Sequence, residues 1–135
     1  MDLNKLNDAL IALVRKKNEL AEMSYSDASY DEAEEELHDR EDEFLESYGD
    51  YLEEVLEKIH EEHFPESDVL LPIAYLADEY IEDEEEGFDV DTDQGVVVES
   101  EEYPNKICRL VFIPSPLRFV MIVGGSHRKV VWKAK

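Results

Sequence analysis

The sequence predicts an α+β domain, in which an N-terminal antiparallel helical hairpin with a long second helix precedes a small antiparallel β-meander. Up to about residue 63, apolar residues recur at steps of three and four, which is the period of a helix with one buried face. Beyond residue 88, apolar residues come in short runs separated by Pro- or Gly-containing turns, which is typical of strands. With 135 residues, 43% of them hydrophobic, the chain has the length of one domain and enough apolar residues for a core.

Residues 2–23 are expected to form the first helix. Its leucines follow the alternating spacing of a coiled-coil seam: Leu3, Leu6, Leu10, Leu13 and Leu20. A short break at residues 24–27 should separate it from the second helix. Two start signals compete there. Ser26 as N-cap would make Tyr25 and Tyr30 a hydrophobic staple, whereas Ser29 and Glu32 match a capping box.

The second helix is expected to end near His63, because Pro65 follows. Its apolar stripe is narrow at first and becomes wide between Phe44 and Ile59. A hairpin that turns near residue 25 can cover only the first half of this helix with the shorter first helix. The wide half must therefore pack against a sheet or against a second copy of the chain. Gly49 inside the helix costs about 1 kcal/mol relative to Ala.

The single domain, residues 1–135, is expected to comprise the hairpin (1–64), an acidic connector (65–87) and the sheet (88–135). Residues 69–82 fit either a helix or a strand, and Pro72 as a first helical residue favours a short helix. The acidic run 82–86 should form an exposed turn. Strands are expected at 88–91, 96–99, 107–113, 117–123 and 129–133, with the first two joined as a hairpin by Thr92–Gly95.

The charge is sorted along the chain. Residues 24–103 contain 32 of the 36 acidic residues and two basic ones, a net charge of −30. The last 32 residues contain no acid and seven bases: Lys106, Arg109, Arg118, Arg128, Lys129, Lys133 and Lys135. Four of these bases are expected to pair with acids of the same or a neighbouring molecule, or else to bind an anion: Arg118, Arg128, Lys129 and Lys133. The acidic part should repel nucleic acid and anionic membranes and attract a basic protein surface.

Nine carboxylates follow one face of the second helix, opposite the apolar stripe. We call them the carboxylate ridge: Glu32, Glu35, Glu36, Asp39, Glu43, Glu46, Asp50, Glu53 and Glu57. In a straight helix they would span about 37 Å with one charge per roughly 4 Å, close to the ~3.4 Å spacing of phosphates in a DNA strand. A straight rod with that charge could occupy the nucleic-acid groove of a basic protein.

Three interpretations of the ridge stay open: a merely solvated helix face, a site for a basic partner, and adaptation to high salt. Solvated helix faces usually intersperse bases that form i,i+4 pairs, and here Arg40 and Lys58 are nearly alone. The acid-free C-terminal segment argues against adaptation to salt.

No catalytic residue, cofactor site or metal site is assigned. Glu57-x-x-His60, with His63 nearby, has the spacing found in di-iron bundles, but such sites need two such motifs. Asp89-x-Asp91-x-Asp93 resembles the start of a calcium loop, although the required Gly and Glu are out of place. The single cysteine, Cys108, lies in an apolar run and is expected to be a buried, inert thiol, as suits a reducing compartment.

Residues 26–31 (Ser-Asp-Ala-Ser-Tyr-Asp), followed by Glu36 and Leu37, resemble part of the N-terminal hairpin of bacterial NAD-dependent DNA ligases. In that family the segment helps to hold the nicotinamide mononucleotide part of NAD, at positions that would match Asp27, Tyr30 and Asp31. The family's preceding aromatic pair and its Lys-x-Asp-Gly motif are absent here. An N-cap with a tyrosine staple would produce the same residues, so no family is assigned.

The N-terminus shows no secretory signal, and the longest apolar stretch, 110–125, is interrupted by two prolines and an arginine. We therefore expect a soluble, cytoplasmic protein. The first hypothesis is a non-enzymatic acidic binding or inhibitor protein, of the nucleic-acid-mimic type or the immunity or phage-inhibitor type, that presents the ridge to a basic, nucleic-acid-binding protein. The alternative is a homo-oligomeric scaffold assembled through the apolar stripe of the second helix. An enzyme or metal protein using Glu57, His60 and His63 ranks last.

Overall fold

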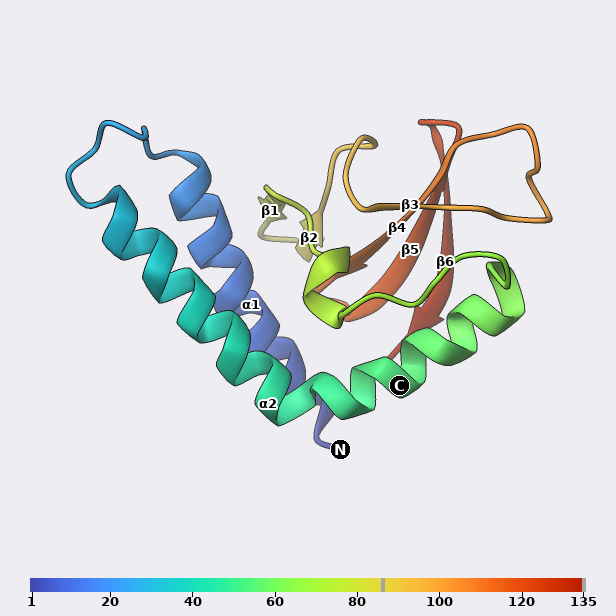
Figure 1. The fold of residues 1–135 in the computed structure, drawn as a ribbon, viewed down its shortest axis with the longest axis horizontal. Helices are drawn as coiled ribbons and strands as arrows, with labels where there is room; N and C mark the ends of the chain where they lie inside the picture. Colours follow the sequence, from blue (N-terminus) through green and yellow to red (C-terminus); the bar gives the residue numbers. More distant parts are fainter. Residues whose placement is uncertain (86, 135) are drawn as a thin grey trace.

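The computed structural model describes residues 1–85 and 87–134, and it shows a helical hairpin followed by a small antiparallel sheet (Figure 1). Helix α1 spans Leu3–Ala21, and the long helix α2 spans Tyr30–His63. The carboxylate of Asp2 caps α1 by accepting hydrogen bonds from the backbone N–H groups of Asn4 and Lys5, each at 3.1 Å. The predicted α+β class and the long second helix are confirmed.

The start of α2 agrees with the second predicted alternative in position only. Ser29 is the N-cap residue, but its side chain makes no cap hydrogen bond. Its hydroxyl and backbone N–H instead donate to the carboxylate of Asp27, at 2.8 and 3.0 Å. The rings of Tyr25 and Tyr30 do meet, with centroids 4.8 Å apart, although Tyr30 is the first helical residue. The segment therefore forms an Asx-type turn beside two tyrosine rings that contact each other at a tilt of 51°, and the predicted capping-box hydrogen bonds are absent.

Helix α2 bends in its middle. Its first half runs beside α1, and its second half turns and runs beneath the sheet (Figure 1). The wide apolar stripe is thus buried within the same chain, with Leu52, Leu56 and Ile59 almost completely covered. Of the two coverings that the sequence allowed for this stripe, the structure uses the sheet.

The main sheet has four antiparallel strands in the order β3-β4-β5-β6, which is a simple meander. The strands are β3 (Val96–Val98), β4 (Cys108–Ile113), β5 (Arg118–Val123) and β6 (His127–Lys133). The last three agree with the predicted strands to within two residues. β4 and β5 are apolar at almost every position because both of their faces are covered, as for a central strand of a layered domain.

The connector differs from the prediction. Pro72 does start a helix, but η1 (Pro72–Tyr75) is a single 3-10 turn, after which Leu76 is extended. A short hairpin follows, in which β1 (Ile81–Asp83) pairs with β2 (Gly87–Asp89). The start of the acidic run 82–86 is therefore strand rather than turn, and residue 86 lies outside the described residues.

The predicted hairpin around Thr92–Gly95 is wrong, because β2 pairs with β1 and β3 pairs with β4. Two arginines of the sheet explain the difference. Arg118 donates to the carbonyl of Phe88 at 2.8 Å, and Arg128 donates to the carbonyl of Val90 at 2.7 Å. These long-range bonds hold β2 and the residue that follows it against the sheet, and no local sequence pattern predicts them.

Two asparagines of α1 attach this helix to the rest of the domain. The amide of Asn18 pairs with the backbone of Tyr80 in both directions, accepting from its N–H at 2.7 Å and donating to its carbonyl at 2.9 Å. Asn7 accepts a hydrogen bond from the N–H of Ser115 at 2.9 Å. The helical hairpin is therefore joined to both the connector and the β4–β5 turn by directional bonds as well as by apolar packing.

Cys108 lies in the core, and burial raises the pKa of its thiol, in agreement with the predicted inert side chain. Among the described residues, no helix combines the length and the apolar character needed to cross a bilayer.

Candidate functional site

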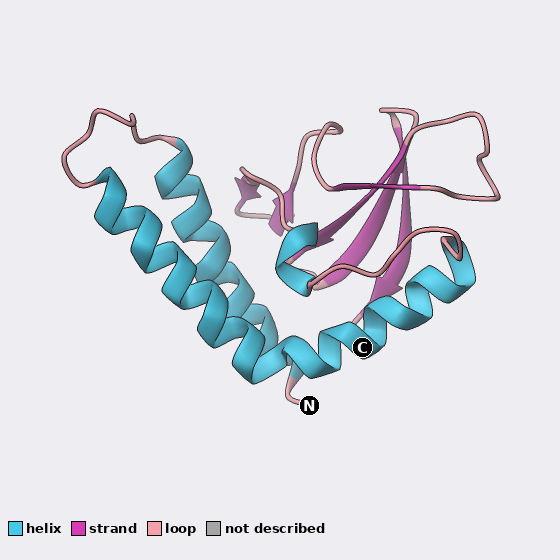
Figure 2. Cartoon of the chain, in the orientation of Figure 1, coloured by secondary structure: helices cyan, strands magenta, loops and turns pink. Residues whose placement is uncertain are grey.

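The carboxylate ridge lies on the exposed face of α2. Eight of its nine residues are exposed, and Glu53 is half-buried. Because α1 and the sheet both lie on the inner side of the bend in α2, the ridge follows the outer, convex side of the helix (Figure 2). The straight rod expected from the sequence is therefore wrong. The two halves of the bent helix pack against different parts of the domain (Figure 1).

One ridge residue is neutralised within the chain. Glu36 contacts Lys16 of α1 and Arg40 of α2, each at 3.2 Å. The neighbouring Lys16 and Arg40 lower the pKa of the Glu36 carboxyl group. Over residues 1–85 and 87–134, no other basic side chain lies within 4.0 Å of a ridge carboxylate.

The bases of the C-terminal segment contact groups other than the carboxylate ridge. Arg128 forms an ion pair with Asp89, the last residue of β2, and Lys129 contacts Glu102 at 3.2 Å. Arg118 donates to the backbone carbonyls of Pro114, Pro116 and Phe88. The prediction that these bases pair with acids of the same chain is thus confirmed for Arg128 and Lys129, whose partners lie in β2 and in the loop before β4 and not on the ridge. Lys135 lies outside the described residues.

The residues of the metal hypothesis are not brought together. Glu57 is exposed on the ridge, whereas His60 is buried and only 3% exposed. His63 is half-buried and lies 3.8 Å from Glu62. Asp89 of the calcium-like motif is engaged by Arg128. In the described part of the chain, no three His, Cys, Asp or Glu side chains are placed to hold a metal ion.

His60 instead is the centre of a buried hydrogen-bond network that the sequence analysis missed. Its Nδ1 lies 3.1 Å from the carbonyl of Ser67, and its Nε2 lies 2.8 Å from the hydroxyl of Tyr75. Because a carbonyl only accepts, Nδ1 carries the proton. The Tyr75 hydroxyl then donates to Nε2 and accepts from the N–H of Leu70 at 3.0 Å. Every donor in this hydrogen-bond network has an acceptor when the imidazole is neutral. Burial lowers the pKa of His60, which favours this neutral form.

A sequence signal for this network existed. His60 follows Leu56 by four residues and so falls on the apolar stripe of α2, where a polar side chain needs a buried partner. The identity of that partner could not be read from the sequence, since Tyr75 lies beyond the helix end and is completely buried against it.

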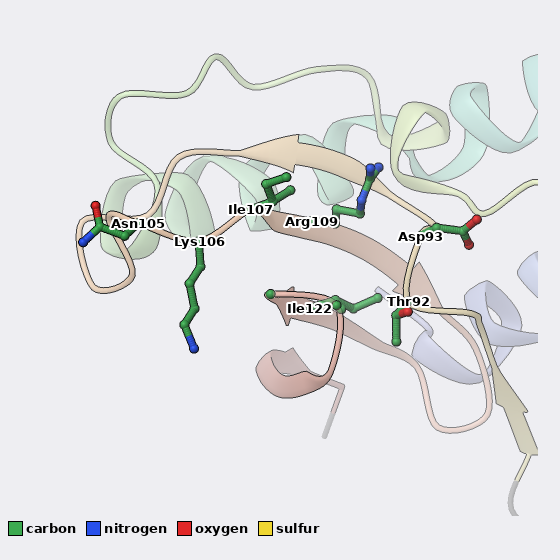
Figure 3. Close-up of a pocket in the computed structure, with 9 residues that line it drawn as sticks. Thr92, Asp93, Asn105, Lys106, Ile107, Arg109 and Ile122 are labelled. Atoms are coloured by element: carbon green, nitrogen blue, oxygen red, sulfur yellow. The ribbon is translucent and has the colours of Figure 1, made fainter.

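A cavity of about 530 Å³ lies beside β4, the Gly124–Gly125 turn and the loop before β3 (Figure 3). Its polar side chains do not converge: Lys106 and Asp93 point in different directions in the close-up, and Arg109 donates to the carbonyl of Gly95 at 3.5 Å. Small-molecule sites place a few polar groups around one ligand position. The cavity therefore lacks the arrangement of a ligand site, and the ridge remains the candidate surface.

Comparison of the chain with protein-family models, with curated proteins and with solved structures finds no match.

Proposed function

We propose that this chain is a non-enzymatic acidic binding protein that presents the carboxylate ridge to a basic, nucleic-acid-binding protein and competes with nucleic acid for that surface. The observation that carries this proposal is the lack of counter-charge along the ridge. Eight exposed or half-exposed carboxylates have no basic partner within ion-pair distance among the described residues, although the same chain has an acid-free basic segment.

A bare row of carboxylates destabilises its own helix. Like charges four residues apart cost roughly 0.2–0.5 kcal/mol per pair, so the four such pairs of the ridge that do not involve the neutralised Glu36 cost about 0.8–2 kcal/mol. These pairs are Glu35–Asp39, Asp39–Glu43, Glu46–Asp50 and Glu53–Glu57. Interspersed lysines would remove this cost. A binding role for the ridge accounts for their absence.

The bend in α2 limits how the ridge can meet a partner. A straight groove can contact only one half of the helix at a time. The half beside α1, from Glu32 to Glu46, spans about 21 Å at 1.5 Å per residue. This half carries six of the nine carboxylates and projects away from the sheet (Figure 1). We therefore place the main contact on the arm formed by α1 and the first half of α2.

Association driven by this surface should be fast at low salt and weaken as salt rises, because surface charges are screened over a Debye length. The test compares three forms of the full chain as immobilised bait in a lysate. The first is unchanged, the second carries Glu43→Lys, Glu46→Lys and Asp50→Lys, and the third carries Glu66→Lys, Glu84→Lys and Glu101→Lys. The third is a matched control, since its three exposed acids lie off the ridge and the change in net charge is the same.

We expect a basic nucleic-acid-binding protein to bind the unchanged and control forms and not the ridge variant. Duplex DNA should displace it, and its dissociation constant should rise at least about a hundredfold between roughly 50 and 500 mM salt. A partner that binds both variants equally, or that binds equally at both salt concentrations, would contradict the proposal.

The homo-oligomeric alternative receives no specific support. The stripe from Phe44 to Ile59 that would join two copies is already covered by α1 and the sheet. Light scattering over a range of concentrations tests this alternative directly, and a mass that rises with concentration would favour it.

A further inference from the structure

Three consecutive aliphatic residues in the connector face solvent. Val69, Leu70 and Leu71 are 39, 42 and 55% exposed, and we call them the apolar strip. Single exposed apolar residues are ordinary on protein surfaces, whereas adjacent ones that form a patch mark interaction sites. The strip is therefore the feature of this surface that solubility alone does not explain.

The strip is not part of a loose loop. The N–H of Leu70 donates to the buried Tyr75 hydroxyl, and the carbonyl of Leu71 accepts from the N–H of Ala74 at 2.9 Å. Just before the strip, the carbonyl of Ser67 binds His60 and its hydroxyl accepts from the N–H of Glu99 at 2.8 Å. The backbone is thus attached at both ends while the aliphatic side chains point outward. Because this backbone is already ordered, binding of a partner to these side chains would cost little conformational entropy in the strip.

The strip adjoins the end of the carboxylate ridge. Val69, Leu70 and Leu71 line one groove of about 320 Å³ together with Glu53 and Glu57. The two carboxylates are four residues apart on α2, and neither has a basic partner within ion-pair distance in the described part of the chain. Apolar contact and negative charge are therefore available side by side, on the half of α2 that lies beneath the sheet.

We propose that the apolar strip, Glu53 and Glu57 form a docking surface for an amphipathic basic segment of a partner protein. Aliphatic side chains of that segment pack on the strip, and its Lys or Arg side chains pair with the two carboxylates. This inference rests on the proposed function and specifies the partner, because charge alone attracts any cation whereas the strip selects a segment that is also apolar. A second copy of this chain is a poor occupant, since each copy carries a formal net charge of −23.

Two synthetic peptides of about 18 residues serve as probes, long enough for about five helical turns. One has Lys on one helical face and Leu on the other, and its match has Ser in place of every Leu. Fluorescence anisotropy measures the affinity of each for the full chain at low and high salt. We expect the Leu/Lys peptide to bind at least about tenfold more tightly than the Ser/Lys peptide, a ratio that corresponds to about 1.4 kcal/mol.

The Leu70→Ser, Leu71→Ser variant should remove this difference between the peptides. The matched variant Val97→Ser, Ile107→Ser also loses two exposed aliphatic side chains, elsewhere on the surface, and should keep the difference. Circular dichroism and urea unfolding establish that both variants fold. A Leu70→Ala, Leu71→Ala variant with smaller loss of area should show an intermediate ratio.

Each outcome has a distinct meaning. If the ridge variant Glu43→Lys, Glu46→Lys, Asp50→Lys weakens both peptides but the serine variant of the strip leaves their ratio unchanged, the docking surface is refuted and the proposed function stands. If a Glu53→Lys, Glu57→Lys variant leaves the affinities of both peptides unchanged, the docking surface is refuted, whereas the proposed function is judged separately by the lysate comparison of the ridge and control variants. A molecular mass that rises with concentration and falls back in the strip variant would identify a second copy as the occupant, and would overturn the inference.

Discussion

Replacing Tyr75 with Phe tests the buried network at the end of α2. The substitution removes one hydroxyl and keeps the ring, which packs edge-on against Phe119 with centroids 6.1 Å apart. The lost hydroxyl is the partner of two groups. It donates to Nε2 of His60 at 2.8 Å, and it accepts the N–H of Leu70 at 3.0 Å.

The expected loss of stability follows from the two polar groups that the substitution leaves without a hydrogen-bond partner. A buried polar group that loses its hydrogen bond costs about 1–3 kcal/mol. Nε2 of His60 is deeply buried, whereas Leu70 is itself exposed, so water can reach its N–H more easily. We therefore expect Tyr75→Phe to lower the free energy of unfolding by about 2–4 kcal/mol, most of it from His60. This is a large share of the roughly 5–15 kcal/mol typical of a domain.

Urea unfolding near neutral pH measures the effect through the midpoint and the slope m. The matched control is Tyr25→Phe, which removes a hydroxyl from a side chain that is 87% exposed and should change stability by less than about 0.5 kcal/mol. A loss for Tyr75→Phe below about 0.5 kcal/mol at unchanged m would refute the reasoning, because it would mean that neither group depends on the hydroxyl.

Three further predictions concern other parts of the chain. The pKa of His60 is lower in the folded state than its ordinary value, so the unfolded state binds more protons. The free energy of unfolding should therefore fall as the pH drops below about 6.5. If a His60→Gln variant loses stability equally steeply between pH 7 and 5, the effect belongs to other groups. Gly49→Ala should raise stability by about 0.5–1 kcal/mol, because the added Cβ would lie 3.7 Å from Leu45 in ordinary contact and Ala favours a helix interior; a lower melting temperature would show instead that the bend in α2 needs glycine. Gly95→Ala should be strongly destabilising, because Gly95 has a φ of +98° and an added Cβ would lie 2.6 Å from the carbonyl oxygen of Leu110. An unchanged midpoint of urea unfolding would contradict this steric account.

Much of the local structure could be read from the sequence because it depends on neighbouring residues. The stripe of α1 and the strands around Phe112 and Phe119 follow from the spacing of apolar residues, and the end of α2 near His63 follows from Pro65. The elements that were mispredicted depend on partners far along the chain. β2 does not form the predicted hairpin with β3, because Arg118 and Arg128 bind the carbonyls of Phe88 in β2 and of Val90 just after it, 30 and 38 residues away along the chain.

The ridge shows the same division. That nine carboxylates share one face of a helix follows from their spacing alone, and the structure places them on the exposed side as expected. The sequence could not show that the helix bends, or that the apolar strip lies beside Glu53 and Glu57. Both depend on where the connector returns after α2.

The sequence by itself determined the class of fold, the period of its helices and strands, and the separation of acidic from basic segments, because each of these is a property of neighbouring residues. Only the tertiary structure decided that the wide stripe of α2 is covered by the sheet, that His60 meets Tyr75, and that the C-terminal bases are engaged away from the ridge. Those contacts join residues that are far apart in the sequence, and they form because together they bury apolar surface while leaving few polar groups without a hydrogen bond. The free energy of this burial depends on the whole folded chain and not on any local segment.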